Sequence, residues 1–230
     1  QPTPEILQCD ISPFILEAAA WGSDLAHLPL LDRPTDAQLA AAYEYLLALE
    51  ALDEHHHLTA HGQQIQQLGA EPGIANMLLY AAQHDDQIRS LAATLAALLE
   101  GRDPLSQTDS ADISLRLHWL QQHKQHSLWQ QIRYWHQRFN WPVMAGQWPL
   151  AECGVLLATA YPQWLAKSRQ AGRFLLRQGS GVVLGNDDPL TDQPWLVIGS
   201  MTVTDHSPGD ARVRLAASIS AGQMAQLYAS

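Results

Sequence analysis

One stretch of this sequence combines positive charge with aromatic rings, two features that suit the binding of a single strand of nucleic acid. Residues 113–151 contain no Asp or Glu, and they hold five of the eight tryptophans together with Arg116, Lys124, Arg133 and Arg138. Cationic side chains can follow a phosphate backbone, and indole rings can stack on bases. The segment therefore predicts a surface for single-stranded nucleic acid.

The tryptophans of this segment could instead belong to a hydrophobic core. Trp135 falls on a helical stripe that also contains Leu128 and Ile132, so we expect it to be buried. Trp129 lies one turn before Arg133 and away from that stripe. We therefore predict that Trp129 and Arg133 lie at the surface.

The charge of the whole chain hides a sharp division along the sequence. The net charge is −10, which taken alone argues against a phosphate-binding protein. Residues 1–112 contribute −14, residues 113–186 contribute +7, and residues 187–230 contribute −3. Such asymmetry indicates that one face meets an anion while the rest stays acidic, although a solvated helix surface would give the same pattern.

Three other groupings of reactive residues are weaker candidates. His55-His56-His57 with His61 could bind a metal, because imidazoles four positions apart on a helix can share one ion. An exposed hairpin is the favoured interpretation of these histidines. Gly179-Ser180-Gly181 is typical of a turn between strands, and Asp205-His206-Ser207 cannot form a catalytic relay from adjacent positions on one loop.

Length and composition limit the class of protein. The 230 residues allow one large domain or two to three small ones. There is no apolar run long enough for a membrane span and no signal peptide, so we expect a cytoplasmic chain. Gln1 predicts a fragment or a processed product. Cys9 and Cys153 have no metal-ligand spacing, and we expect two buried free thiols.

The first elements that position these residues are helices and one hairpin. Ser12-Pro13 predicts a helix start, with Gly22 at its end. Thr35 and Gln38 have the spacing of a capping box and predict a second helix. A small hairpin is expected at residues 54–59, followed by a second polar turn at Gly62.

The rest of the chain changes from helical to strand patterns. From Pro72 to about Pro162 the apolar residues recur with a helical period, with Gly101 as a helix stop and residues 101–110 as a loop. After residue 170, short apolar or alternating runs are separated by Gly, Pro and Asp. These runs predict a small β-domain, with the following strands: Arg173–Leu176, Val182–Leu184, Trp195–Ile198 and Ala211–Leu215.

A series of short motifs resembles the region that follows the motor in DEAH-box helicases. In chain order they are Pro4-Glu5-Ile6, Gly22-Ser23-Asp24-Leu25, Leu31-Asp32-Arg33-Pro34, Ala51-Leu52-Asp53, Leu58-Thr59-Ala60-His61-Gly62 and Met77-Leu78. Further motifs resemble the bacterial HrpB-type branch of that family. They are Gly172-Arg173-Phe174, Gly179-Ser180-Gly181, Asp188-Pro189-Leu190, Pro194-Trp195-Leu196-Val197 and Gly209-Asp210-Ala211-Arg212.

The resemblance implies a mainly helical, multidomain α+β chain. It implies a winged helix at 1–66, a helical ratchet bundle at 67–162 and a small OB-like β-domain at 163–230. It further implies that the chain helps to enclose single-stranded RNA or DNA and packs on the motor domains. The implied strand contacts are Arg116, Lys124, Trp129, Arg133, Arg138, Lys167, Arg169, Arg173 and Arg177.

The motor itself is missing from this sequence. A helicase motor needs a Gly-rich phosphate loop ending in Lys-Ser/Thr and a carboxylate that holds Mg²⁺. The sequence contains neither the loop motif nor Asp-Glu-Ala-His. We expect ATP and Mg²⁺ to bind in motor domains elsewhere, no cofactor in this chain, and no ATP hydrolysis by this chain alone.

Two functions of other classes use the same features. A free-standing winged-helix regulator would need base-reading side chains, but the helix expected at 35–51 offers Gln38, no Lys or Arg, and two glutamates. A protein-interaction scaffold would instead use the acidic first half to dock a partner.

Overall fold

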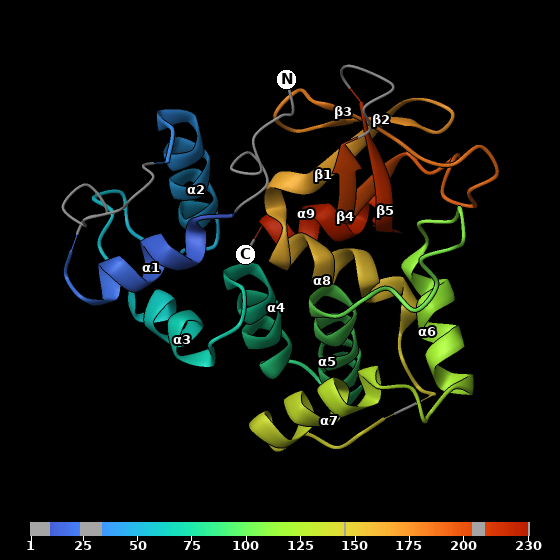
Figure 1. Cartoon of the computed structure of the whole chain (residues 1–230), viewed down its shortest axis with the longest axis horizontal. Helices are drawn as coiled ribbons and strands as arrows, with labels where there is room; N and C mark the ends of the chain where they lie inside the picture. Colours follow the sequence, from blue (N-terminus) through green and yellow to red (C-terminus); the bar gives the residue numbers. More distant parts are fainter. Residues whose placement is uncertain (1–9, 24–33, 145, 204–209, 230) are drawn as a thin grey trace. The chain divides into compact units, whose positions relative to one another are not determined.

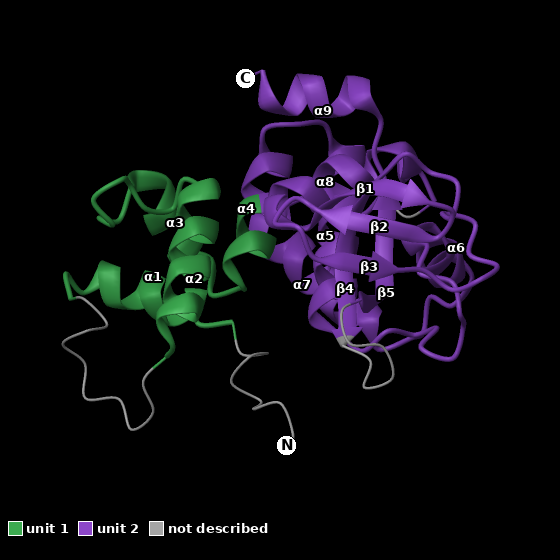
Figure 2. Ribbon diagram, turned by 90° about the horizontal axis from the view of Figure 1, so that it is seen from above, with its two compact units in different colours: residues 1–76 green, residues 77–230 purple. Residues whose placement is uncertain are grey.

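The computed structural model describes residues 10–23, 34–144, 146–203 and 210–229, which separate into two compact units. Unit 1 comprises residues 1–76 and unit 2 comprises residues 77–230 (Figure 2). Several expectations fall outside the described residues: the Pro4-Glu5-Ile6 motif, Cys9, Asp24-Leu25, Leu31-Asp32-Arg33 and Asp205-His206-Ser207. The two units are treated separately below.

Unit 1 is built from short helices. α1 (Ser12–Ala20) packs against α2 (Asp36–Ala48) and α3 (Ala60–Leu68), and α4 (Pro72–Ala82) runs on into unit 2. The capping box of α2 is present, because the Thr35 hydroxyl accepts from Gln38 N and the Gln38 side chain accepts from Thr35 N. α1 starts at Ser12-Pro13 as expected, but Ser12 is its first helical residue and not its N-cap. The Asp10 side chain accepts a hydrogen bond from the Ser12 N–H at 2.9 Å.

The hairpin expected at 54–59 is present in reduced form. Leu52 and Leu58 form an isolated antiparallel bridge, and Asp53 Oδ1 accepts from the N–H groups of His55 and His57. The polar turn expected at Gly62 is wrong, because Gly62 lies inside α3. A Cβ there would lie 2.0 Å from the Ala51 carbonyl oxygen, so glycine is required for close packing of the helix on the hairpin.

A central apolar helix organises the helical part of unit 2. α5 (Asp86–Glu100) is buried from Ser90 to Leu98 and packs against α7 (Leu128–Phe139) and α8 (Cys153–Ala160). α6 (Ile113–Gln122) contacts the sheet, and two single turns, η3 (Leu150–Glu152) and η4 (Pro162–Trp164), flank α8. Gly101 ends α5 in an extended conformation, where a Cβ would lie 2.5 Å from Leu128 Cδ2.

Five strands form a closed barrel in unit 2 (Figure 1). They are β1 (Leu165–Gln170), β2 (Arg173–Leu176), β3 (Gly181–Val183), β4 (Trp195–Val203) and β5 (Asp210–Ser218). The order is β1-β2-β3-β5-β4, and only the β3–β5 pairing is parallel. Its interior is closed by apolar side chains such as Ala166, Phe174, Val182, Leu196 and Val213.

The mixed helix and strand composition is confirmed, and besides α3 two further elements were not expected. β1 was not predicted because Ala166 is its one fully buried residue, so apolar and polar residues do not alternate along it. α9 (Ala221–Tyr228) follows the barrel where we expected only β-structure. Ser220 and Gln223 form a capping box at its start, a spacing that is visible in the sequence. No described helix is both long and apolar enough to cross a bilayer.

A buried polar cluster holds Trp141, Met144 and Trp148 on the helical part of unit 2. Ser90 Oγ accepts from Trp148 Nε1 at 3.2 Å and from Met144 N at 3.1 Å. His136 Nε2 lies 3.4 Å from Ser90 Oγ, and its Nδ1 lies 3.3 Å from the Trp141 carbonyl oxygen. A neutral imidazole fits both contacts, with Nδ1–H donating to the carbonyl and Nε2 accepting from the hydroxyl.

This cluster predicts acid sensitivity of unit 2. Burial lowers the pKa of His136 below its ordinary 6.5. The unfolded chain therefore takes up the proton first, and the free energy of unfolding should fall as pH drops through 6.5 toward the folded pKa. Urea unfolding at pH values on either side of this window should show a smaller fall for His136→Gln than for the unchanged chain. An equal fall would contradict this assignment.

Candidate nucleic-acid interface

The barrel carries basic side chains on the outer surface of β1 and β2. Ala166, Phe174 and Leu176 point into the core, so the alternating positions Lys167, Arg173 and Arg177 point outward. β1 and β2 are paired antiparallel along this surface. Arg177, just after β2, donates its N–H to the Leu165 carbonyl at 3.1 Å. The strand pairing therefore brings these three positions onto one outer surface.

An aromatic ring lies beside these charges. Lys167 is paired with Trp195 of β4, and its Nζ lies 5.4 Å from the centre of the Trp195 ring. A cation held over an indole face is an attractive contact, and a partly exposed ring beside it can stack on a base. Trp195 was not among the expected contacts. The sequence does place Trp195 at the start of a predicted strand, because it opens an apolar run immediately after Pro194.

The cations of the barrel differ in how fully they are neutralised. Arg173 Nη1 lies 2.9 Å from Asp210 Oδ2, in an exposed ion pair. Arg169 is exposed where the β1–β2 register shifts between Ser168 and Gln170. In the described part of the chain no acidic partner meets Lys167, Arg169 or Arg177. These three keep their full charge for an external anion.

The helices present a second, separate group of cations. Arg133 and Arg138 are exposed on α7, and Lys124 is exposed between α6 and α7. Arg133 and Arg138 stand about 140° apart around the helix axis, at the two edges of its polar face. Figure 1 places α7 at the opposite end of unit 2 from the barrel strands. The structure does not gather the basic residues into one continuous patch.

The two tryptophans of α7 are both buried, one of them against expectation. Trp129 is 4% exposed, and its Nε1 donates to the Leu120 carbonyl at 3.2 Å. The prediction that Trp129 lies at the surface was wrong, because its indole stacks on the ring of Trp148 and lies against Leu120 of α6. Trp135 is 2% exposed, which confirms its expected burial.

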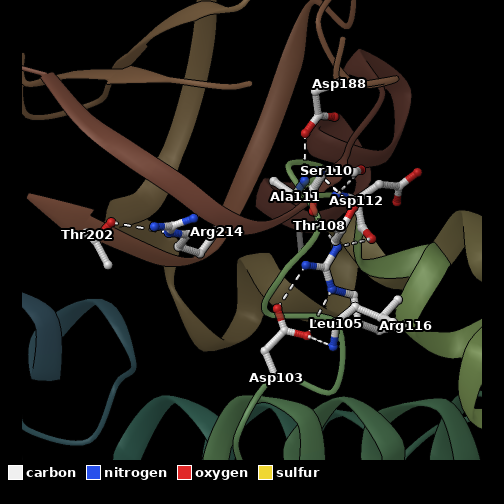
Figure 3. A network of polar contacts seen from close by, with 10 residues as sticks. All are labelled: Asp103, Leu105, Thr108, Ser110, Ala111, Asp112, Arg116, Asp188, Thr202 and Arg214. Carbon is white, nitrogen blue, oxygen red and sulfur yellow. Dashed lines mark hydrogen bonds and ion pairs between the residues drawn. The ribbon is translucent and has the colours of Figure 1, made fainter. Parts of the chain in front are cut away.

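Arg116 is an interior residue, 1% exposed. Its Nη2 lies 2.8 Å from Asp103 Oδ2 and its Nε 3.2 Å from Asp103 Oδ1, while Nη1 donates to the carbonyls of Ser110 and Asp112. Every nitrogen of the guanidinium is engaged inside the protein (Figure 3). Arg116 is therefore corrected from a strand contact to a structural residue.

The negative charge of the chain is concentrated in unit 1. Unit 1 has 11 acidic residues against Arg33, a net charge of −10. Unit 2 has 12 acidic and 12 basic residues and no net charge. Unit 1 should repel a polyanion, so the basic surfaces of unit 2 are the candidates for phosphate contacts.

The histidines and the cysteine of the described residues form no metal centre. His56 stacks on Tyr43 with ring centres 4.0 Å apart, and His61 Nε2 lies 2.6 Å from Asn76 Oδ1. In the described ranges no three His, Cys, Asp or Glu side chains converge as metal ligands. Cys153 is buried, as expected, and burial raises the pKa of its thiol to about 12.

Comparison with known proteins finds similarity to a bacterial helicase. The Escherichia coli (strain K12) ATP-dependent RNA helicase HrpB is 34% identical over 229 residues, which cover 98% of this chain and 27% of that protein. The chain matches no protein-family model. It spans about a quarter of the length of this curated relative.

Solved structures give the same result. The crystal structure of the E. coli DExH-box NTPase HrpB aligns with a TM-score of 0.77 at 32% identity, covering 98% of this chain and 27% of that one. A structure of the Escherichia coli DEAH/RHA helicase HrpB aligns with a TM-score of 0.75 at 29% identity, covering 96% and 27%. The resemblance suggested by the short motifs is thereby confirmed.

Proposed function

Because this chain corresponds to a region of an HrpB-type helicase, we propose that it is an accessory, non-motor portion of an ATP-dependent RNA helicase. The observation that carries the proposal is the match along 98% of the chain, in sequence and in structure. The absence of the phosphate loop from the sequence supports a division of labour in which ATP and Mg²⁺ bind in motor domains. Such a helicase would work in the cytoplasm.

We propose that the strand follows the outer surface of β1 and β2. Lys167, Arg169 and Arg177 supply uncompensated charge there, and Trp195 supplies a ring for stacking. A closed five-stranded barrel supports the OB-like assignment of residues 163–230, since OB folds bind oligonucleotides on their strands and loops. The helices between 67 and 162 would then form the ratchet bundle, with Arg133, Arg138 and Lys124 as more distant contacts.

The proposal predicts weak, sequence-independent binding of single-stranded RNA by the purified chain. Each phosphate neutralised on a single strand contributes about −0.7 to the slope of log affinity against log salt, so three contacts give about −2. A fluorescent oligouridylate titrated at several salt concentrations measures this slope, and the matching deoxyoligonucleotide compares RNA with DNA. Failure to bind at the lowest salt, or binding insensitive to salt, would overturn the proposed strand path.

A protein-docking role for unit 1 is the second candidate, and its charge of −10 favours it. We propose that residues 1–66 form a winged helix that packs on the motor domains and does not read bases. α1, α2, α3 and the hairpin at Leu52–Leu58 support that assignment. α3 exposes Gln63, Gln64 and Gln67, but neither α2 nor α3 carries a Lys or Arg to hold a phosphate. A groove-reading regulator is disfavoured for that reason.

A further inference from the structure

A small cavity of unit 2 lies away from the strand surface described above. Its volume is about 290 Å³, and it opens between the loop at 103–110 and strands β4 and β5. The residues with polar side chains around it are Asp103, Ser106, Thr108, Asp109, Ser110, Arg116, Ser200 and Arg214. Hydroxyl and guanidinium groups dominate this set.

Arg214 gives the cavity a positive charge with which none of the described carboxylates is paired. Its Nε donates to Thr202 Oγ1 at 3.4 Å, and no carboxylate or other acceptor contacts its two Nη groups in the described part of the chain. The carboxylates at the cavity are already engaged by other cations. Asp103 is paired with Arg116, and Asp109 lies 2.9 Å from Arg212.

Two hydroxyl groups of the loop accept hydrogen bonds from backbone N–H groups of the same loop. Thr108 Oγ1 accepts from Ser110 N at 3.3 Å, and Ser110 Oγ accepts from Asp112 N at 3.2 Å. In these contacts the hydroxyl oxygen is the acceptor, so each hydroxyl hydrogen stays available to a ligand. Ser106 and Ser200 add two more hydroxyls at the same cavity.

The loop that carries these donors is firmly held. Arg116 Nη1 donates to the Ser110 carbonyl at 2.6 Å, and Ala111 N donates to the buried Asp188 carboxylate at 2.6 Å (Figure 3). The Ala111 carbonyl accepts from Ala216 N of β5 at 2.8 Å. The donors are thus preorganised before any ligand arrives, which reduces the entropic cost of binding.

We propose that this cavity is a binding site for a phosphate group, with Arg214 as its cation and the hydroxyls of Thr108 and Ser110 as its hydrogen-bond donors. An uncompensated guanidinium at a cavity that is also lined by hydroxyl groups matches an anion that has several acceptor oxygens. The cavity has room for a phosphate together with an attached sugar. This site does not depend on the strand path proposed for β1 and β2.

Inorganic phosphate titrated into the whole chain tests the site. The amide signals of Ser110, Ala111 and Val213 should shift in a saturable way in phosphate and not in chloride at equal ionic strength. Arg214→Gln should weaken phosphate binding by at least about tenfold, because a charge-assisted contact is lost. Arg169→Gln makes the same change of net charge on β1 and should leave phosphate binding unchanged.

The hydroxyl donors give a second, independent variant. Thr108→Val with Ser110→Ala keeps Arg214 and should weaken phosphate binding by about 25-fold, which is about fivefold for each of the two hydrogen bonds lost. Circular dichroism confirms that each variant is folded. The site would be refuted by the absence of a saturable shift, or by Arg214→Gln and Arg169→Gln behaving alike.

Two further titrations separate the sources of the phosphate. The first uses a nucleoside 5′-monophosphate and the second an RNA oligomer without terminal phosphates. If the monophosphate competes with inorganic phosphate and the RNA oligomer does not, the cavity binds a free phosphorylated molecule. Competition by that RNA oligomer, lost in Arg214→Gln, assigns it to a backbone phosphate. Replacing Lys167, Arg169 and Arg177 should leave inorganic phosphate binding intact even if it abolishes the proposed strand path.

Discussion

Asp103→Ala is expected to lower the free energy of unfolding of unit 2 by about 3–5 kcal/mol. The Arg116 guanidinium is 1% exposed, and Asp103 is the one carboxylate that contacts it among the described residues. Arginine keeps its charge in a protein, so removal of Asp103 leaves that charge buried and uncompensated. Urea unfolding followed by tryptophan fluorescence measures the loss.

The exposed pair of Asp109 and Arg212 supplies a matched control from the same loop. Its side chains are 91% and 31% exposed, and water screens such a pair, so Asp109→Ala should cost less than about 1 kcal/mol. Replacing Arg116 with Met in the Asp103→Ala background should recover most of the lost free energy of unfolding, because it removes the buried, unpaired charge. Equal losses for Asp103→Ala and Asp109→Ala would refute a structural role for the buried pair.

The buried pair explains why Arg116 could not be assigned from the sequence. Arg116 lies in a basic segment between Leu115 and Leu117. A surface arginine on an amphipathic helix would have the same neighbours in the sequence. Its partner Asp103 lies 13 positions upstream in a polar loop. A pairing between a loop and a helix leaves no periodic signal, and local charge counting therefore assigns the residue to the wrong face.

Periodic elements were predictable where one face alone is buried. The stripe of Leu128, Ile132 and Trp135 is in the core as expected, and β2 matches its predicted range. The prediction for Trp129 was wrong because Trp148 and Leu120 cover a second side of α7, so the buried face of this helix is wider than one stripe. Which of the exposed cations share a surface depends on strand pairing and helix packing, and these are set by long-range contacts.

The last prediction concerns which cations hold the strand. Replacing Lys167, Arg169 and Arg177 together with Gln should remove about three phosphate contacts and flatten the salt slope from about −2 to near zero. In the unchanged chain a tenfold rise in salt should lower affinity by about 100-fold, and in the triple variant by less than about twofold. Arg173→Gln should change the slope much less, because Asp210 already neutralises that guanidinium.

The arginines of α7 provide the spatial control for the same measurement. Arg133→Gln with Arg138→Gln should leave the slope unchanged for an oligonucleotide of about eight residues, which fits a site the size of one barrel. The reason is distance, since α7 lies at the far end of unit 2 from β1 and β2 (Figure 1). If the α7 variant weakened this short oligonucleotide as much as the barrel variant did, with both folded by circular dichroism, the strand would not follow the barrel surface.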